Sequence, residues 1–154
     1  MTKKKISILY VDDEANNLIA FRAVYRTKYT IYTALSGLEG LEILNEHDIH
    51  IVITDQRMPN MTGVEFLEKV IELHPAPIRI LLTGYTDMSA IIDAVNKGSI
   101  YHYLNKPWDE DELEEIIEKA YEVYLKKIEI IEDNKELTMT NQQLEFLLRQ
   151  KLLS

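Results

Sequence analysis

The stretch "IVITDQRMPN", residues 51 to 60, decides the fold, because an apolar strand within it ends at a carboxylate. Four consecutive β-branched residues suit a strand that is buried on both faces of a sheet. Such a strand seldom ends in an unpaired charge, since burying one is costly. Asp55 therefore needs a partner, a metal ion or a chemical role, and the rest of the chain has to show which.

Five short apolar runs have the length of strands, and amphipathic segments separate them. The strand candidates are residues 6–11, 30–34, 51–54, 78–82 and 100–104, and the helix candidates are residues 16–28, 36–46, 64–73, 88–96 and a long segment from 109 onward. This alternation predicts an α/β fold. We expect a doubly wound five-stranded parallel sheet of the flavodoxin-like order 2-1-3-4-5, with a long C-terminal helix.

The carboxyl ends of the predicted strands carry the polar residues. Asp12 and Asp13 follow the first strand, Asp55 the third, Thr83 the fourth and Lys106 the fifth. In a doubly wound sheet these ends meet at one edge, where three carboxylates would repel one another unless a cation neutralised them. Oxygen ligands of this kind suit Mg²⁺. A carboxylate, a divalent cation, a lysine and a threonine together predict a phosphoryl-accepting site.

Four motifs occur in order at these strand ends: "ILYVDDE", "ITDQRMPNMTG", "ILLTGY" and "YHYLNKPW". Over roughly residues 5–125 the chain resembles the receiver domains of bacterial response regulators. The resemblance implies a phosphorylation-dependent switch of a two-component system, with Mg²⁺ as cofactor. Its partner would be a sensor histidine kinase or a phosphotransfer protein. The variant "LTGY…YLNKPWD" is also similar to receivers fused to enzymatic outputs such as HD-GYP phosphodiesterases.

The resemblance also implies a role for the residues that bind the phosphoryl group and the metal ion. Asp55 matches the phosphoacceptor. Asp12 and Asp13 match the acidic pair that binds Mg²⁺ together with Asp55 and the backbone carbonyl of Arg57. Arg57 and Tyr85 flank this site, and we expect them to tune the lifetime of the phosphoryl group.

The implied switch involves four further residues. Thr83 matches a hydroxyl that binds the phosphoryl group and moves with it, and Lys106 matches the lysine that pairs with that group. Tyr103 matches the switch aromatic, and Pro107 the proline that follows a cis peptide bond at Lys106. When Thr83 moves inward, Tyr103 would turn in behind it. The face around the fourth helix, fifth strand and fifth helix would change as a result.

The segment after Asp109 contains no proline or glycine and predicts one long helix. Written in heptads, one set of positions is wholly aliphatic: Ile116, Val123, Ile130, Leu137 and Leu144. The other set includes Asn134 and Asn141, which are typical of two-stranded coils with a fixed register. We therefore expect a receiver domain at 1–124. Residues 125–154 would form a coiled coil that makes a homodimer, or a linker to an output domain. Alternatively, residues 116, 117, 120, 121 and 124 pack on the sheet and the rest frays.

Composition excludes several classes of protein. The net charge is −9, and residues 109–154 hold six Lys and Arg against 13 Asp and Glu, so we expect no direct nucleic acid binding. The absence of cysteine excludes disulfides and fits the cytoplasm. The apolar run at residues 6–11 is too short for a signal peptide or a membrane span. His47 and His50 in "HDIH" are expected to be solvated rather than metal ligands.

Three functions compete at this stage. The first is a receiver that gates an output or a dimer interface. The second is a phosphatase of the haloacid dehalogenase type. That class has a D-x-D pair at the end of the first strand, whereas Asp12 and Asp13 are adjacent in this chain. The third is a scaffold in which only the coil acts. We expect no enzyme activity beyond self-directed phosphotransfer and autodephosphorylation.

Overall fold

The computed structural model describes residues 5–84 and 88–153, so Tyr85 lies outside the described part of the chain. By its internal contacts the chain divides into two compact units, residues 1–124 and residues 125–154. Each unit is described by itself below. No helix within the described ranges is long and apolar enough to cross a membrane.

The first unit is built on a parallel sheet in the order β2-β1-β3-β4-β5, as predicted. Its strands are β1 (Ser7–Val11), β2 (Thr30–Ala34), β3 (Ile51–Asp55), β4 (Ile78–Thr83) and β5 (His102–Asn105). In the register of the central pair, Val11 lies opposite Thr54. The next residue on each strand is an aspartate, so Asp12 and Asp55 come together at the carboxyl edge.

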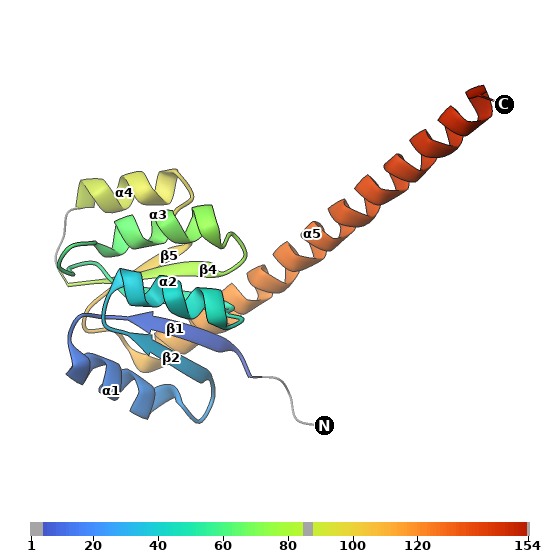
Figure 1. The fold of residues 1–154 in the computed structure, drawn as a ribbon. Coiled ribbons are helices and arrows are strands. Elements are labelled where there is room, and N and C mark those ends of the chain that lie inside the picture. Colours follow the sequence, from blue (N-terminus) through green and yellow to red (C-terminus); the bar gives the residue numbers. More distant parts are fainter. Residues whose placement is uncertain (1–4, 85–87, 154) are drawn as a thin grey trace. The chain divides into compact units, whose positions relative to one another are not determined.

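Five helices accompany the sheet: α1 (Ala15–Tyr25), α2 (Gly37–Glu46), α3 (Gly63–Leu73), α4 (Met88–Asn96) and α5 (Glu110–Leu153). Figure 1 shows α2 and α3 on one side of the sheet and α1 on the other. The first turns of α5 contact the connection between α1 and β2, where the Lys28 ammonium pairs with Glu114 at 2.8 Å and the Tyr29 hydroxyl donates to Glu118. Because both faces are covered, most of the buried residues in the central strands β1, β3 and β4 are apolar.

Local signals in the sequence explain several helix ends. The Ser36 hydroxyl accepts the Glu39 N–H at 3.1 Å and caps the start of α2. A capping box joins Thr62 and Glu65 at the start of α3, where the sequence has the pattern T-x-x-E. After α4, Gly98 takes a φ of 79°, the left-handed conformation expected of a residue that ends a helix.

The predicted fifth strand began two residues too early. The apolar run starts at Ile100, but β5 begins at His102. Ile100 is buried in the connection that precedes the strand, and the Tyr101 N–H donates to the Arg79 carbonyl at 2.8 Å. A buried side chain in a connection cannot be distinguished from a strand residue by hydrophobicity alone.

The prediction of a solvated His50 was wrong. Its side chain is only 4% exposed, and Nδ1 accepts the backbone N–H of Ser7 at 2.9 Å. The ring packs against Tyr121 and Tyr124 of α5, with centroid distances of 5.2 and 4.9 Å. The aromatic partners come from a segment about 70 residues away, so no local pattern around "HDIH" could have indicated this burial.

Helix α5 presents one buried face to the sheet within the first unit. That face consists of Leu113, Ile117, Ala120 and Tyr124. The expected packing residues Ile116 and Tyr121 are only half-buried. Val123, one of the aliphatic heptad positions, lies outside this buried face and is exposed.

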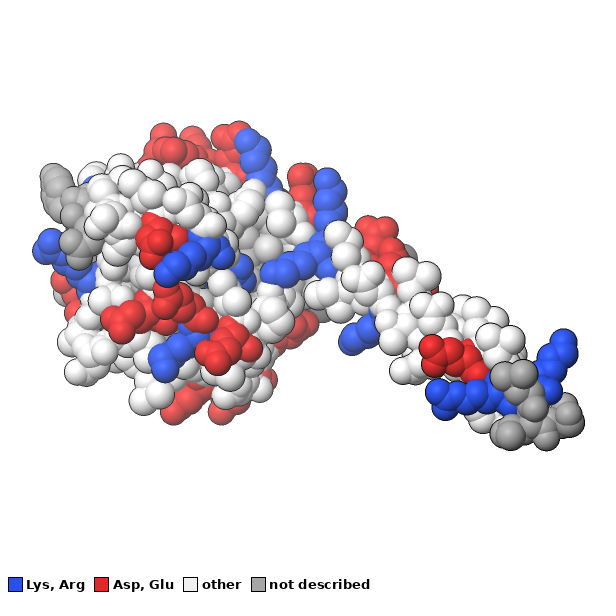
Figure 2. Space-filling view, turned by 90° about the horizontal axis from the view of Figure 1, so that it is seen from above, with Lys and Arg blue, Asp and Glu red and all other residues white. Residues whose placement is uncertain are grey.

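In the second unit, the aliphatic side chains lie exposed along the helix. Ile130, Leu137 and Leu144 are each more than half exposed, and so are Phe146, Leu147 and Leu148. Figure 2 shows that much of the surface of this segment is uncharged. Such a stripe is unusual for a helix that stays in contact with water only.

Candidate functional site

The carboxyl edge of the sheet brings together the three predicted acidic residues. Oxygen atoms of Asp12, Asp13 and Asp55 all lie within 4.8 Å of one another. Asp12 is fully buried, Asp55 is half-buried and Asp13 is exposed, so the cluster opens toward solvent on the side of Asp13. Three carboxylates at this separation repel one another strongly in the ionised state.

Lys106 is the cation that faces this cluster. Its Nζ lies 3.1 Å from Asp55 Oδ1 and 3.3 Å from Asp12 Oδ2. The backbone holds it there, because the Lys106 N–H donates to the Thr83 carbonyl at 2.8 Å. The peptide bond between Lys106 and Pro107 is cis. One ammonium against three carboxylates leaves the cluster with a net negative charge.

The pKa values at the cluster follow from burial and from these charges. Burial raises the pKa of Asp55 above its ordinary value, an effect that Lys106 opposes and Asp12 reinforces. For Lys106, burial acts against the charged form, but Asp55 and Asp12 outweigh it and the pKa is raised. Lys106 therefore keeps its positive charge. That single charge does not neutralise the carboxylates of the cluster.

The donor set fits a divalent cation. Its atoms are carboxylate oxygens, which are hard ligands, and their negative charge exceeds what Lys106 supplies. Asp12, Asp13 and Asp55 are the residues that would hold Mg²⁺. Arg57 is exposed in the loop between β3 and α3, and the role of its carbonyl as a ligand stays a prediction.

Thr83 is placed at the end of β4 with its hydroxyl unsatisfied. The residue is 1% exposed, and among the buried side-chain atoms of the described residues its Oγ1 is the one without a hydrogen-bond partner. Buried hydroxyls almost always find a partner, because leaving one unpaired costs free energy. Thr83 pairs with Asn105 in the sheet, so its side chain lies on the same face as that of Tyr103. Tyr103 is exposed.

Two residues that bind Asp12 were not predicted from the sequence. The Tyr10 hydroxyl donates to Asp12 Oδ2 at 2.8 Å, and the Asn17 side-chain amide donates to the same oxygen at 3.1 Å. Burial and the neighbouring Asp12 raise the pKa of Tyr10, so the hydroxyl keeps its proton. The signal was present, since Tyr10 and Asp12 are two residues apart on a strand and share a face.

Gln56, which directly follows Asp55, was also not predicted as a site residue. Its Oε1 accepts the Val64 N–H at 2.9 Å, and its backbone carbonyl accepts the Gly63 N–H. Both donors belong to the first turn of α3, where N–H groups have no partner within the helix. Gln56 thereby ties the end of β3 to the start of α3.

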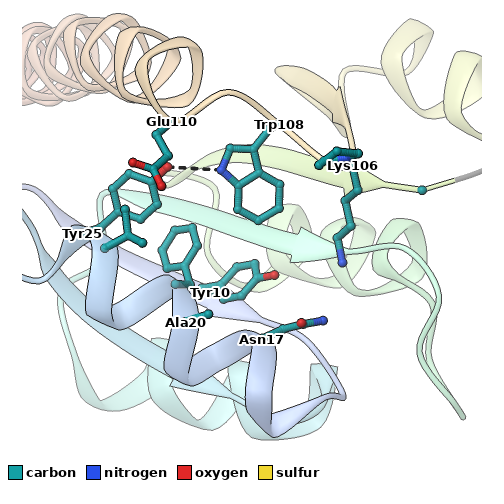
Figure 3. Close-up of a pocket in the computed structure, with 11 residues that line it drawn as sticks. Tyr10, Asn17, Ala20, Tyr25, Lys106, Trp108 and Glu110 are labelled. Atoms are coloured by element: carbon teal, nitrogen blue, oxygen red, sulfur yellow. Dashed lines mark hydrogen bonds between the residues drawn. The ribbon is translucent and has the colours of Figure 1, made fainter.

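Beside the cluster, a cavity of about 550 Å³ lies between α1 and the loop that follows β5. Its walls include four aromatic residues, Tyr10, Phe21, Tyr25 and Trp108. Figure 3 shows Lys106 and Asn17 at one end of this cavity, and the indole of Trp108 donating to the Tyr25 hydroxyl at 3.2 Å. The cavity therefore adjoins the acidic cluster.

Comparison with known proteins decides the family. The model of the response regulator receiver domain matches residues 8–118. The chain belongs to this family. Receiver domains accept a phosphoryl group on an aspartate, take it from histidine kinases and bind Mg²⁺ at an acidic pocket. The three aspartates of this receiver form an acidic cluster at the corresponding edge of the sheet.

Curated relatives are longer than this receiver. The hydrogenase transcriptional regulatory protein HoxA of Cupriavidus necator is 38% identical over 122 residues, which is 79% of this chain and 25% of that protein. The transcriptional regulatory protein ZraR of Escherichia coli K12 is 34% identical over 121 residues, 78% of this chain and 27% of that protein. The chain thus spans about a quarter of the length of these relatives.

Solved structures of receivers have the same fold. The signal receiver domain of an HD domain-containing protein from Pseudomonas fluorescens Pf-5 is 32% identical with a TM-score of 0.76, over 80% of this chain and 99% of that one. A CheY-like receiver domain protein from Methanospirillum hungatei JF-1 is 26% identical with a TM-score of 0.75, over 80% and 99% of the two chains.

Proposed function

We propose that Asp55 of this receiver accepts a phosphoryl group from the phosphohistidine of a sensor kinase or a phosphotransfer protein. The observation that carries the proposal is the buried, unpartnered hydroxyl of Thr83 at the edge where Lys106 pairs with Asp55 at 3.1 Å. A phosphoryl group on Asp55 would give that hydroxyl an acceptor. It would also give Lys106 a stronger anion to pair with.

The transfer itself needs a nucleophile and neutralisation of charge. An oxygen of Asp55 attacks phosphorus while the bond from phosphorus to the imidazole nitrogen breaks, and the electron pair stays on the imidazole. Lys106 faces the phosphoryl oxygens and offsets their charge. Mg²⁺ held by Asp12, Asp13, Asp55 and the carbonyl of Arg57 supplies further positive charge when bound.

The switch follows from the position of Thr83 and Tyr103 on one face of the sheet. Thr83 would move toward the phosphoryl group, and Tyr103 would turn in from its exposed position to fill the space. A hollow of about 590 Å³ beside Tyr103 is lined by residues of α4, β5 and α5, among them Val95, Leu104 and Glu112. Rearrangement of this face is the signal that we propose an output reads.

The second unit offers a second target for the signal. We propose that residues 125–154 pair with the same segment of another copy as a coiled coil. The support is the exposed aliphatic row Ile130, Leu137 and Leu144, with Asn134 and Asn141 in the other heptad set. Direct binding of nucleic acid by this chain is not part of the proposal, because the segment after Asp109 is acidic.

We propose further that the receiver is not an enzyme acting on outside substrates. The haloacid dehalogenase alternative needs two aspartates one residue apart at the end of the first strand, and here Asp12 and Asp13 are adjacent. The self-directed reactions are acceptance of the phosphoryl group and its later hydrolysis. Repeated turnover of a phosphate ester, undiminished by Asp55→Asn, would contradict this part of the proposal.

The deciding experiment is intact mass spectrometry after incubation with acetyl phosphate, with and without Mg²⁺. We expect one phosphoryl adduct that needs Mg²⁺ and is absent in Asp55→Asn. Asp13→Asn is a second variant, expected to reduce the adduct by weakening the metal site. No adduct on the unaltered chain at saturating Mg²⁺ would overturn the proposed function.

A further inference from the structure

One oxygen atom of the acidic cluster collects an unusual number of hydrogen bonds. Asp12 Oδ2 accepts from the Tyr10 hydroxyl at 2.8 Å, from the Asn17 amide at 3.1 Å and from Lys106 Nζ at 3.3 Å. Two of these donors are uncharged and one is a cation. The cation is shared, because Lys106 also lies 3.1 Å from Asp55 Oδ1.

Packing fixes the direction of the Tyr10 hydroxyl. The residue is fully buried in β1, and its ring stacks on that of Phe21 at a centroid distance of 4.2 Å with an interplanar angle of 15°. Figure 3 shows the Tyr10 hydroxyl at the end of the cavity where Asn17 and Lys106 also lie. A side chain held in this way places its donor at little further cost in entropy.

We propose that Tyr10 and Asn17 are positioning residues that satisfy Asp12 Oδ2 with uncharged donors, so that Lys106 serves Asp55 and the charge of Asp12 is left for Mg²⁺. This inference rests on the proposed function and adds to it that the uncharged donors bind Asp12 while the cation binds Asp55. Neither residue touches the reacting atoms. Both act through Asp12.

The physical argument starts from the complete burial of Asp12. A buried carboxylate oxygen needs donors, and it takes them from whatever lies within reach. A hydroxyl or an amide supplies a hydrogen bond without supplying a net charge, so the carboxylate keeps its attraction for a divalent cation. If those donors are removed, Asp12 draws on Lys106 instead. The ammonium then neutralises the carboxylates that Mg²⁺ needs and moves away from Asp55.

The test measures the Kd for Mg²⁺ of the full unphosphorylated chain by isothermal titration calorimetry. Tyr10→Phe removes the hydroxyl and keeps the stacked ring, and Asn17→Ala removes the other uncharged donor from a helix surface. Tyr29→Phe is the matched control, since Tyr29 is also buried and its hydroxyl also donates to a carboxylate, that of Glu118. Thermal unfolding checks that each variant is folded.

We expect Tyr10→Phe to raise the Kd for Mg²⁺ about tenfold, the size of effect typical of groups that orient metal ligands. Asn17→Ala should act in the same direction, and Tyr29→Phe should leave the Kd unchanged. In a Lys106→Ala background the competing cation is gone, so adding Tyr10→Phe should change the Kd little. A purely structural role of Tyr10 would give the same loss in both backgrounds.

The outcomes separate this inference from the proposed function. If the unaltered chain binds Mg²⁺ and Tyr10→Phe binds it equally well, the positioning role is overturned while the phosphoacceptor proposal stands. If the tenfold loss persists in the Lys106→Ala background, competition by Lys106 is overturned. If the unaltered chain binds no Mg²⁺, the metal site and the inference that rests on it both fail.

Discussion

The hydroxyl of Thr83 is buried without a partner at the place where a phosphoryl group would arrive. A residue of this kind contributes to function at some expense of stability, because a methyl group of the same shape would need no hydrogen bond. The Asp55 carboxylate resembles it, since burial disfavours its charged form. We therefore expect substitutions of Thr83 and of Asp55 to stabilise the fold and to weaken signalling.

Thr83→Val should leave the free energy of unfolding unchanged or raise it by up to about 1 kcal/mol, since it replaces an unpaired hydroxyl by a methyl group. The matched control is Thr54→Val. Thr54 is equally buried, but its hydroxyl donates to the Asp55 carbonyl at 2.9 Å, so this variant should lose about 1 kcal/mol. Urea denaturation measures both. A larger loss for Thr83→Val than for Thr54→Val would contradict the assignment of Thr83 as unpartnered.

Asp55→Asn should raise the free energy of unfolding near pH 7 in Mg²⁺-free buffer. The folded protein raises the pKa of Asp55 above the ordinary value of 3.8, so folding favours the protonated carboxyl. The destabilising contribution of the ionised group is absent below pH 3.8 and complete above the raised pKa. The gain from Asp55→Asn should therefore shrink as pH falls toward 3.8. Denaturation curves at several pH values test this, and a variant less stable than the unaltered protein at pH 7 would refute it.

At the scale of elements, the start of α3 fits tightly against the end of β3. A Cβ on Gly63 would clash with the backbone carbonyl of Asp55 and would lie 2.8 Å from the Leu81 side chain. The Gly63 N–H also donates to the Gln56 carbonyl at 3.0 Å. The absence of a side chain at Gly63 is therefore what lets the phosphoacceptor strand and α3 approach each other.

Gly63→Ala should destabilise the protein by about 1–3 kcal/mol, because backbone cannot yield as a flexible side chain can. It should also slow the modification of Asp55 by acetyl phosphate, since relief of the clash displaces the Asp55 backbone. Gly84→Ala is the control, as no atom of the described residues lies within 4 Å of the added Cβ. Equal stability of the two variants in urea would show that the strand and helix are not held this closely.

The sequence predicted the elements better than it predicted their contacts. Strand order and the meeting of Asp12 with Asp55 followed from alternation and from strand ends, which are local patterns. The burial of His50 did not follow, because its aromatic neighbours come from α5. The Tyr10 hydroxyl was overlooked for a different reason: a tyrosine in an apolar strand passes for a core residue until the position of its oxygen is known.

At the scale of the whole chain, association through the second unit gives a direct prediction. Leu137→Glu places a charge in the exposed aliphatic row and should shift the chain from dimer to monomer in sedimentation velocity. Met139→Glu is the control, because Met139 is equally exposed but lies outside both heptad sets. A monomer for the unaltered chain at tens of micromolar, or equal effects of both variants, would contradict the coiled coil.

Thr83 also limits how far one contact can drive the switch. A hydrogen bond to a charged group is worth roughly 1.5–3 kcal/mol, whereas reversing a population from 1:99 to 99:1 takes about 5.5 kcal/mol. If one receiver in a hundred is active before phosphorylation, satisfying Thr83 alone would raise the active fraction to roughly one in ten at the lower value and to about six in ten at the upper value. The remaining bias has to come from Lys106 and the packing of Tyr103, so the loss of any one of them should leave a partly responsive population rather than a silent one.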